Sequence, residues 1–352
     1  MRKKLQNDPA SQIYPVGFNF SDVKTISRML ANATKIEREM FGALNFLFIL
    51  GIIGSIVFFI FDDIPFLFIM SLAVIGLSFL TALIIFYWVG NRDRSNQRKY
   101  YRLSNTQELP QEKAQALQLM VYSDYSSGCW NETLEHSPIE NKVKGVNFFN
   151  FSFSDPNEIR KEIYKDWGIR KKEHYKQRIS ELFDENNQIE RFLTKYVFQP
   201  QGVHELSRLS GISKDKIDSY LIQKDGVDKL IWGFEIWRAI KLARTAYMAE
   251  YISEQEAWED ILMASSYAHT LFDDLDDFIQ NQILGLAVWS GDAELMENEM
   301  MWYQNYNQHC RFSYKFLPWK KQQAELPPYM YNAYSEVRKK YEENLTHQLS
   351  EL

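Results

Sequence analysis

The stretch that decides the fold runs from Trp232 to Trp289 and reads WGFEIWRAIKLARTAYMAEYISEQEAWEDILMASSYAHTLFDDLDDFIQNQILGLAVW. It holds three consecutive segments with helical spacing. In the first segment, Ile236 and Ile240 fall on one apolar stripe with charged residues on the flanking faces. Ser253 begins the second segment and Glu256 follows three positions later, which is the pattern of a capping box. The stretch therefore predicts three successive helices at the centre of an α-helical domain.

The third segment begins with four aspartates, Asp273, Asp274, Asp276 and Asp277. Their spacing satisfies DDxxD, in which carboxylates on one helix face share a magnesium ion. That interpretation predicts a hydrolase or transferase with an acidic metal site. Alternatively, Asp273 or Asp274 caps the helix, and the other two acids lie in its positively polarised first turn. Because no second acidic metal motif is found, we favour the capping interpretation and predict no metal.

One pair of charged residues in the first segment has no obvious role in starting or ending a helix. Glu235 and Arg238 are three residues apart, which is a spacing that lets their side chains meet on a helix. An exposed pair of this kind contributes little to stability, whereas a buried pair is costly to break. We therefore treat Glu235 and Arg238 as the candidate pair, functional or structural, of the domain.

Two long uncharged blocks precede the domain, over residues 41–61 and 66–89. As helices, both are long enough to cross a hydrocarbon core of about 30 Å. Small residues in both blocks would let the two helices pack closely: Gly51, Gly54 and Ser55 in the first, and Ser71, Gly76 and Ser78 in the second. The sequence therefore predicts a transmembrane helical hairpin.

The flanking charges set the expected orientation of the hairpin. Residues 1–40 and the linker 91–109 are basic, whereas the turn between the blocks holds Asp62 and Asp63 and no base. The positive-inside rule then places both termini in the cytoplasm. Neither block contains an acid, a base or a histidine of the kind that transporters and channels usually carry. We therefore interpret the hairpin as an anchor in the lipid bilayer.

The composition gives little support for other function classes. The net charge of the 352 residues is −6, which offers no general case for nucleic-acid binding. One alternative remains at residues 204–221, where the spacing matches a helix-turn-helix and would suit a membrane-tethered DNA-binding regulator. Its second helix carries two lysines and two aspartates, so we expect an ordinary helical hairpin there and no nucleic-acid partner.

Signatures of catalysis and of cofactor binding are missing from the sequence. The six histidines and two cysteines show no metal-ligand spacing. No phosphate-binding glycine loop and no nucleophile elbow is present. We therefore predict no catalytic residues and no cofactor, and favour a non-enzymatic protein.

Short motifs recur in order along the second half of the chain. Phe234, Glu235 and Arg238 make up the first helical motif. The remaining motif positions are, in chain order, Trp167, Gly168, Ile169, Tyr251, Ser253, Glu256, Ala257, Trp258, Gly285, Trp289, Leu317, Pro318 and Trp319. Over about residues 163–319 this order and spacing resemble the bacterial family called domain of unknown function 1266 (DUF1266). Trp237 and Glu250 depart from the family, which tends to have a small residue and a glycine there.

The resemblance implies a mostly helical domain with no established activity and no catalytic residue to carry over. With the predicted hairpin, we expect a mainly α protein of the bacterial inner membrane whose residues 110–352 form a helical cytoplasmic domain. An interaction or regulatory role, for which an immunity role would fit, implies a protein partner whose identity the sequence does not give.

Overall fold

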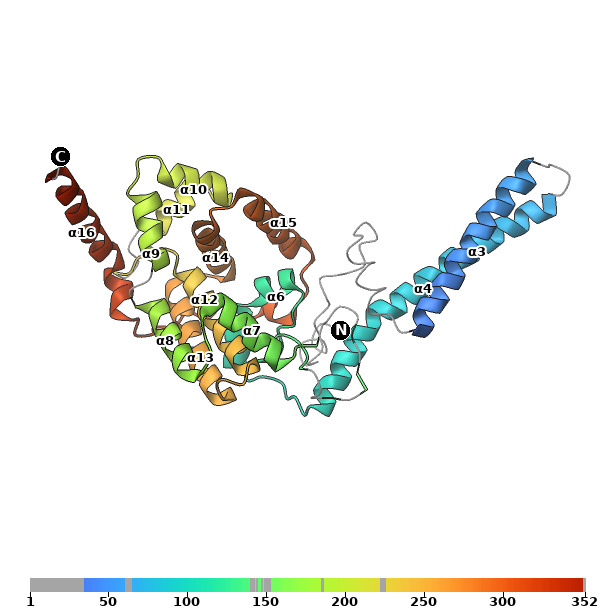
Figure 1. The fold of residues 1–352 in the computed structure, drawn as a ribbon, viewed down its shortest axis with the longest axis horizontal. Coiled ribbons are helices and arrows are strands. Elements are labelled where there is room, and N and C mark those ends of the chain that lie inside the picture. The colour runs from blue at the N-terminus through green and yellow to red at the C-terminus, as the bar shows by residue number, and fades with distance from the viewer. Residues whose placement is uncertain are drawn as a thin grey trace. The chain divides into compact units, whose positions relative to one another are not determined.

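The computed structural model describes residues 35–60, 65–139, 143, 145–146, 148, 153–184, 187–221 and 226–350 (Figure 1). Most of the predicted segment 1–40 lies outside these residues. The chain divides into two compact units. One comprises Val16–Thr106 and Asn141–Ser152, and the other contains Gln107–Glu140 and Phe153–Leu352.

The described residues are mainly α-helical, as predicted, and hold no β-strand beyond an isolated bridge between Ile139 and Ser154. The first unit contains α3 (Lys35–Ile60) and α4 (Pro65–Leu103). The helices of the second unit are α5 (Gln111–Gln118), α6 (Val121–Ser127), α7 (Pro156–Trp167), α8 (Lys172–Phe183), α9 (Asn187–Phe192), the π-helix η1 (Leu193–Val197), α10 (Gly202–Ser210), α11 (Lys214–Ser219), α12 (Trp232–Met248), α13 (Glu254–Leu271), α14 (Leu275–Ser290), α15 (Ala293–His309), the 3₁₀ helix η2 (Ser313–Phe316) and α16 (Pro328–Ser350).

Helices α3 and α4 form a hairpin whose contact is made by small residues (Figure 1). The hydroxyls of Ser55 and Ser71 lie 2.8 Å apart, so they share a hydrogen bond between the helices. A Cβ on Gly51 would lie 2.7 Å from Cγ1 of Ile75, so glycine is required for this approach. The predicted close packing is therefore found at Gly51, Ser55 and Ser71, whereas a Cβ on Gly76 would meet nothing within 4 Å. Helix α4 continues to Leu103 through most of the expected linker 91–109, because no proline or glycine interrupts residues 91–103.

The hairpin leaves large apolar side chains exposed on both helices. Phe46 is 62% exposed on α3 and Leu77 is 66% exposed on α4. Among the helices as far as the structure describes them, none is both long and apolar enough to cross a membrane. The transmembrane assignment of residues 41–61 and 66–89 therefore stays a prediction.

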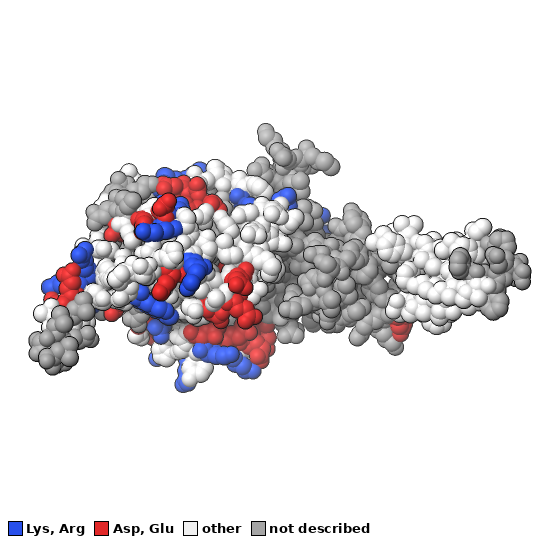
Figure 2. All heavy atoms as spheres, turned by 90° about the horizontal axis from the view of Figure 1, so that it is seen from above, with Lys and Arg blue, Asp and Glu red and all other residues white. Residues whose placement is uncertain are grey.

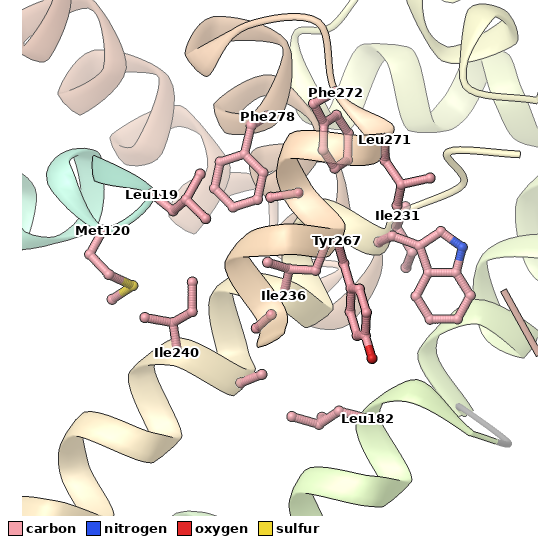
Figure 3. Close-up of a cluster of buried hydrophobic side chains, with 14 of the residues drawn as sticks. Leu119, Met120, Leu182, Ile231, Ile236, Ile240, Tyr267, Leu271, Phe272 and Phe278 are labelled. Carbon is pink, nitrogen blue, oxygen red and sulfur yellow. The ribbon is translucent and has the colours of Figure 1, made fainter. Parts of the chain in front are cut away.

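The second unit is built around α12, which packs against α13, α14, α8 and α7. Figure 3 shows the centre of this core, where Ile236 and Ile240 of α12 face Tyr267 of α13 and Phe278 of α14 among other apolar side chains. All four of these residues are at most 9% exposed. The stripe predicted from the sequence is therefore the stripe that the domain buries.

The ends of the central helices follow the predicted local signals. Ser253 and Glu256 form a complete capping box at the start of α13, since each side chain accepts a hydrogen bond from the other residue's backbone N–H. Asp274 is the N-cap of α14 and accepts the N–H of Asp277 at 2.8 Å. The capping interpretation of the acidic stretch is thus confirmed. Gly291 ends α14 in the left-handed conformation, with φ of 62°.

Candidate functional site on helix α12

Arg244, in the C-terminal half of α12, is the hub of a buried polar network. Its side chain is 1% exposed, and its Nη1 donates to both carboxylate oxygens of Asp124, at 2.8 and 3.1 Å. Nε and Nη2 donate to backbone carbonyl oxygens 3.0 to 3.4 Å away, on Trp130, Thr133, Leu134 and Glu135. Every nitrogen of the guanidinium therefore has an acceptor.

This network explains how an irregular segment can be buried. Residues 130–135 lie in the interior without helix or strand, so their carbonyl groups need donors. Arg244 supplies those donors from one side chain. Asn131 completes the network by donating to Asp124 and to the carbonyl of Leu117, each at 2.8 Å. The Arg244 network therefore has a structural role: it supplies hydrogen-bond donors to a buried irregular segment.

Beside the network, the structure brings together a cysteine and a histidine that sequence spacing did not pair. Cys129 Sγ and His136 Nδ1 are 3.9 Å apart. Burial raises the pKa of the Cys129 thiol to about 12 and lowers the pKa of His136 to about 3. Both groups are therefore neutral near pH 7, which does not suit a nucleophilic thiolate. Among the described residues, no three metal-ligating side chains of His, Cys, Asp or Glu converge on one point.

The candidate residues Glu235 and Arg238 form an ion pair, in which Glu235 is fully buried and Arg238 is partly exposed. Arg238 Nη1 donates to the two carboxylate oxygens of Glu235 at 2.9 and 3.2 Å. The side chain of Glu235 is 0% exposed and that of Arg238 is 19% exposed. The guanidinium carbon also lies 4.7 Å from the ring centroid of Trp167 and 5.5 Å from that of Phe234. An arginine does not deprotonate in proteins, so this arrangement suits binding better than proton transfer.

Two lysines form ion pairs with the acidic stretch Asp273–Asp277. Lys229 Nζ lies 2.6 Å from Asp277 and 3.0 Å from Asp273. Lys216 adds a second contact of 2.7 Å to Asp277, which is 5% exposed. Burial raises the pKa of Asp277, but the hydrogen bonds from the two lysines outweigh it and hold that pKa below its ordinary value. Asp276 lies on the exposed side and accepts from Gln280 and Tyr303.

The same contacts bear on the helix-turn-helix interpretation of residues 204–221. Helices α10 and α11 do form, joined at Gly211 with φ of 69°. The second helix, however, turns Lys216 toward the buried Asp277, and Ile217 is 0% exposed. Acidic and basic side chains also lie side by side over the face of the domain that Figure 2 shows. These contacts favour the ordinary helical hairpin that we predicted.

The family motif positions meet around α12 and α13. Trp167 stacks on Arg238, and Gly168 ends α7 with φ of 71°. A Cβ on Gly285 would lie 2.2 Å from Cβ of Phe234, so this glycine allows α14 to approach α12. Trp319 stacks on the buried His269 of α13, with 4.1 Å between ring centroids. Among the other motif positions, Ile169, Ala257 and Trp258 are buried, and Trp289 is 49% exposed.

The two departures from the family have different outcomes. Glu250 keeps the conformation that glycine favours, with φ of 59°. Its carboxylate lies 2.5 Å from Arg160, which also donates to the carbonyl of Ala249 in the same turn. Trp237 lies on the outer side of α12, away from the close contact at Gly285, and packs 5.5 Å from Phe234. The tight turn and the close helix contact are therefore both present despite the two substitutions.

Comparison with known proteins confirms the family resemblance. The model of the family described as "Protein of unknown function (DUF1266)" matches residues 162–319. Those residues carry α12, α13 and α14 together with the Glu235–Arg238 pair. The DUF1266 match thus coincides with the centre of the second unit, which we call the helical unit.

One relative extends the likeness beyond that region. "Inner membrane protein YnjI" of Escherichia coli (strain K12) is 27% identical over 272 residues, which cover 71% of this chain and 78% of the relative. This share of the chain is larger than the family region, so the likeness reaches outside residues 162–319. No solved structure matches the chain.

Sequence reasoning missed the partners of the charged residues. Lys229 and Lys216 are 48 and 61 residues from Asp277, and Arg244 is 120 residues from Asp124. The sequence pattern placed four charged residues of α12 on the faces that flank its apolar stripe, namely Glu235, Arg238, Lys241 and Arg244. For Arg244 this was wrong, because the structure places it on the buried side of the helix. A charged residue there demands a buried partner, although the sequence does not say which.

Proposed function

We propose that this chain is attached to the bacterial inner membrane through the α3–α4 hairpin, with both termini in the cytoplasm. The observation that carries the proposal is the exposed apolar surface of both helices, including Phe46, Ile53 and Leu77. A water-soluble surface rarely keeps so many large apolar side chains exposed together. The relative YnjI, which is named as an inner membrane protein, adds support, as does the basic character of the segments that flank the hairpin.

We further propose that the helical unit acts by binding rather than by catalysis. The candidate acids are engaged as an N-cap and as ion-pair partners of lysines, and Glu235 is paired with Arg238. A membrane-attached binding domain would suit a regulatory or immunity-like protein that recognises another protein. Affinity capture of the full chain from native membranes, followed by identification of co-purifying proteins, tests this part.

Reporter fusions test the orientation. One fusion is placed at Asp63, in the turn between the helices, and one at the C-terminus. We expect the Asp63 fusion to give an extracytoplasmic signal and the C-terminal fusion a cytoplasmic one. A C-terminal fusion that reports from outside the cytoplasm contradicts the proposed topology.

Membrane attachment itself is tested by alkaline carbonate extraction of membranes containing the full chain. We expect the protein to stay in the pellet and the double variant Ile53→Lys/Leu77→Lys to be released, because each lysine places a charge where lipid is proposed. The matched control Met301→Lys/Phe316→Lys alters residues of the helical unit that are 61% and 59% exposed, and it should stay in the pellet. Release of the wild-type protein overturns the attachment.

The enzymatic alternative is tested at the acidic stretch. The double variant Asp273→Asn/Asp277→Asn removes the carboxylates that face Lys229. We expect a lower melting temperature and no change in magnesium binding, because these acids have lysine partners. A loss of magnesium binding at unchanged stability would instead establish the metal site.

A further inference from the structure

The guanidinium of Arg238 keeps unused donors. Its Nη1 is engaged by Glu235, whereas Nε and Nη2 have no hydrogen-bond acceptor among the residues that the structure describes. These two nitrogens form the edge of arginine that binds carboxylates and phosphates with two parallel hydrogen bonds. Since 19% of the side chain is exposed, this edge is partly open to solvent.

The rings around Arg238 fix the plane of the guanidinium. Trp167 from the end of α7 and Phe234 from α12 lie within 5.5 Å of its central carbon. Glu235 holds the Nη1 side from the interior. A side chain that is clamped in this way loses little conformational entropy when a ligand binds, which favours binding by the free edge.

A second cation stands beside Arg238 on the same face of α12. Lys241 follows three positions later, a spacing that places two side chains next to each other on a helix. Its ammonium lies 5.0 Å from the ring centroid of Trp237 and has no ion-pair partner in the described part of the chain. The indole Nε1 of Trp237 is also buried without an acceptor. The face therefore carries two cations. Glu235 pairs with Arg238, and the charge of Lys241 also acts on the buried Asp124.

We propose that Arg238 and Lys241, framed by Trp167 and Trp237, form a binding site for a phosphate group. A phosphate offers enough oxygens to meet the Nε–Nη2 edge and the ammonium at once, and its charge of nearly −2 matches two cations better than a carboxylate does. The assignment concerns the outer face of α12 and does not depend on the membrane attachment proposed above.

The contrast with Arg244 supports the assignment. Arg244 is enclosed and all of its nitrogens meet acceptors inside the protein. Arg238 lies on the same helix, yet its internal partners use only one nitrogen. An arginine that served the fold alone would be expected to have internal acceptors for the rest, because unpaired donors in a half-buried place are costly.

The test is a titration of the full chain in detergent micelles with inorganic phosphate, at ionic strength held constant with chloride and with tryptophan fluorescence as the readout. Trp167 and Trp237 flank the site, so binding should give a saturable change. We expect Lys241→Gln to weaken binding about tenfold, as for the loss of one charge-assisted hydrogen bond. The control Lys113→Gln removes a lysine that lies 4.6 Å over the ring of Trp258, and it should bind like the wild type.

The outcomes separate clearly. A saturable change that Lys241→Gln weakens and Lys113→Gln leaves intact supports the site. No saturable change in the wild type, or equal weakening in both variants, overturns it. Lys241 is exposed, so its replacement by glutamine leaves the fold intact, and a circular dichroism spectrum verifies this.

The source of the phosphate is addressed by a second probe. Glycerol 3-phosphate carries the phosphate of a lipid headgroup in soluble form. Tighter binding of glycerol 3-phosphate than of inorganic phosphate assigns the site to a phosphoester such as a lipid headgroup. Tighter binding of inorganic phosphate than of glycerol 3-phosphate assigns the site to free phosphate. If neither compound binds, the proposed site is wrong.

Discussion

Two arginines of one helix, Arg244 and Arg238, are held in opposite ways. Arg244 lies in the interior, bonds to Asp124 and donates to four backbone carbonyl groups. Arg238 lies six residues earlier at the edge of the domain, with one carboxylate and two aromatic rings as neighbours. The comparison shows when the fold alone accounts for an arginine on a core helix. It does so only when every N–H donor of the side chain has an acceptor inside the protein. By that measure, one end of α12 is structural and the other retains binding capacity.

The largest effect on stability is expected from replacing Arg244, at the end of α12 that we interpret as structural. Arg244→Met leaves Asp124 buried without its cation and leaves the carbonyl groups of residues 130–135 without donors. Loss of one partner of a buried ion pair costs roughly 3–5 kcal/mol, so the free energy of unfolding should fall by about that amount. Urea unfolding followed by tryptophan fluorescence measures it. A loss of less than about 1 kcal/mol, as at an ordinary surface site, would show that the network does not support the fold.

Acid should weaken the second unit through two buried histidines, His136 beside the Arg244 network and His269 on α13. Burial lowers the pKa of His269 to about 4, and burial together with Arg244 and Lys241 lowers that of His136 to about 3. Because the folded-state pKa values lie below that of an unfolded histidine, the unfolded chain binds more protons. Stability is therefore complete above about pH 6.5 and is lost as the pH falls toward 4.

For His269, which is 0% exposed, the loss amounts to roughly 3 kcal/mol. Urea unfolding at a series of pH values between 7 and 4 measures the slope, and His269→Phe should make it shallower. A slope that this variant leaves unchanged would contradict the buried, neutral state of His269.

The contact of α14 with the Arg238 end is expected to have an intermediate effect. Gly285→Ala adds a methyl group 2.2 Å from Cβ of Phe234, the ring that stacks on Arg238. Overpacking of this kind costs roughly 1–3 kcal/mol, because a Cβ cannot rotate away as the end of a flexible side chain can. The melting temperature should fall accordingly. Gly76→Ala is the control, since a Cβ there meets nothing within 4 Å, and equal losses in both variants would remove the proposed role of Gly285.

The smallest stability effect is expected at the candidate pair itself. Glu235→Gln keeps an oxygen for Arg238 Nη1 but removes the charge, so unfolding should become easier by only about 1 kcal/mol. Phosphate binding should become tighter, because the carboxylate charge that is paired with Arg238 is gone. Weaker phosphate binding in Glu235→Gln would mean that Glu235 acts chiefly by holding Arg238 in place.

The features that were predicted correctly from the sequence are those that depend on residues close together in the chain. The capping box at Ser253, the N-cap at Asp274 and the glycine end of α7 at Gly168 all depend on residues within four positions of one another. The small residues of the hairpin were predictable for a similar reason, since a four-residue turn leaves the two helices no choice but to be neighbours. The order of family motifs located the centre of the domain, and the DUF1266 match confirmed it.

Contacts between distant residues were beyond the sequence. Trp167 stacks on Arg238 although the two are far apart in the chain, and nothing local to either residue encodes that meeting. Glu250 shows the other limit, since it adopts a positive φ that glutamate disfavours, in a turn where Arg160 contacts its carboxylate. Local patterns thus gave the helices, whereas tertiary contacts decided which charged residues were paired.

The most direct test of the difference between the two ends is the melting temperature of the full chain in detergent with and without inorganic phosphate. A ligand that binds only the folded state stabilises it, by about 2.7 kcal/mol at one hundred times its dissociation constant. We predict that phosphate raises the melting temperature of the wild type and of Lys113→Gln equally, and raises that of Lys241→Gln by only about half as much, since binding there is about tenfold weaker. The same rise in all three proteins, or no rise in any, would contradict a phosphate site at the Arg238 end of α12.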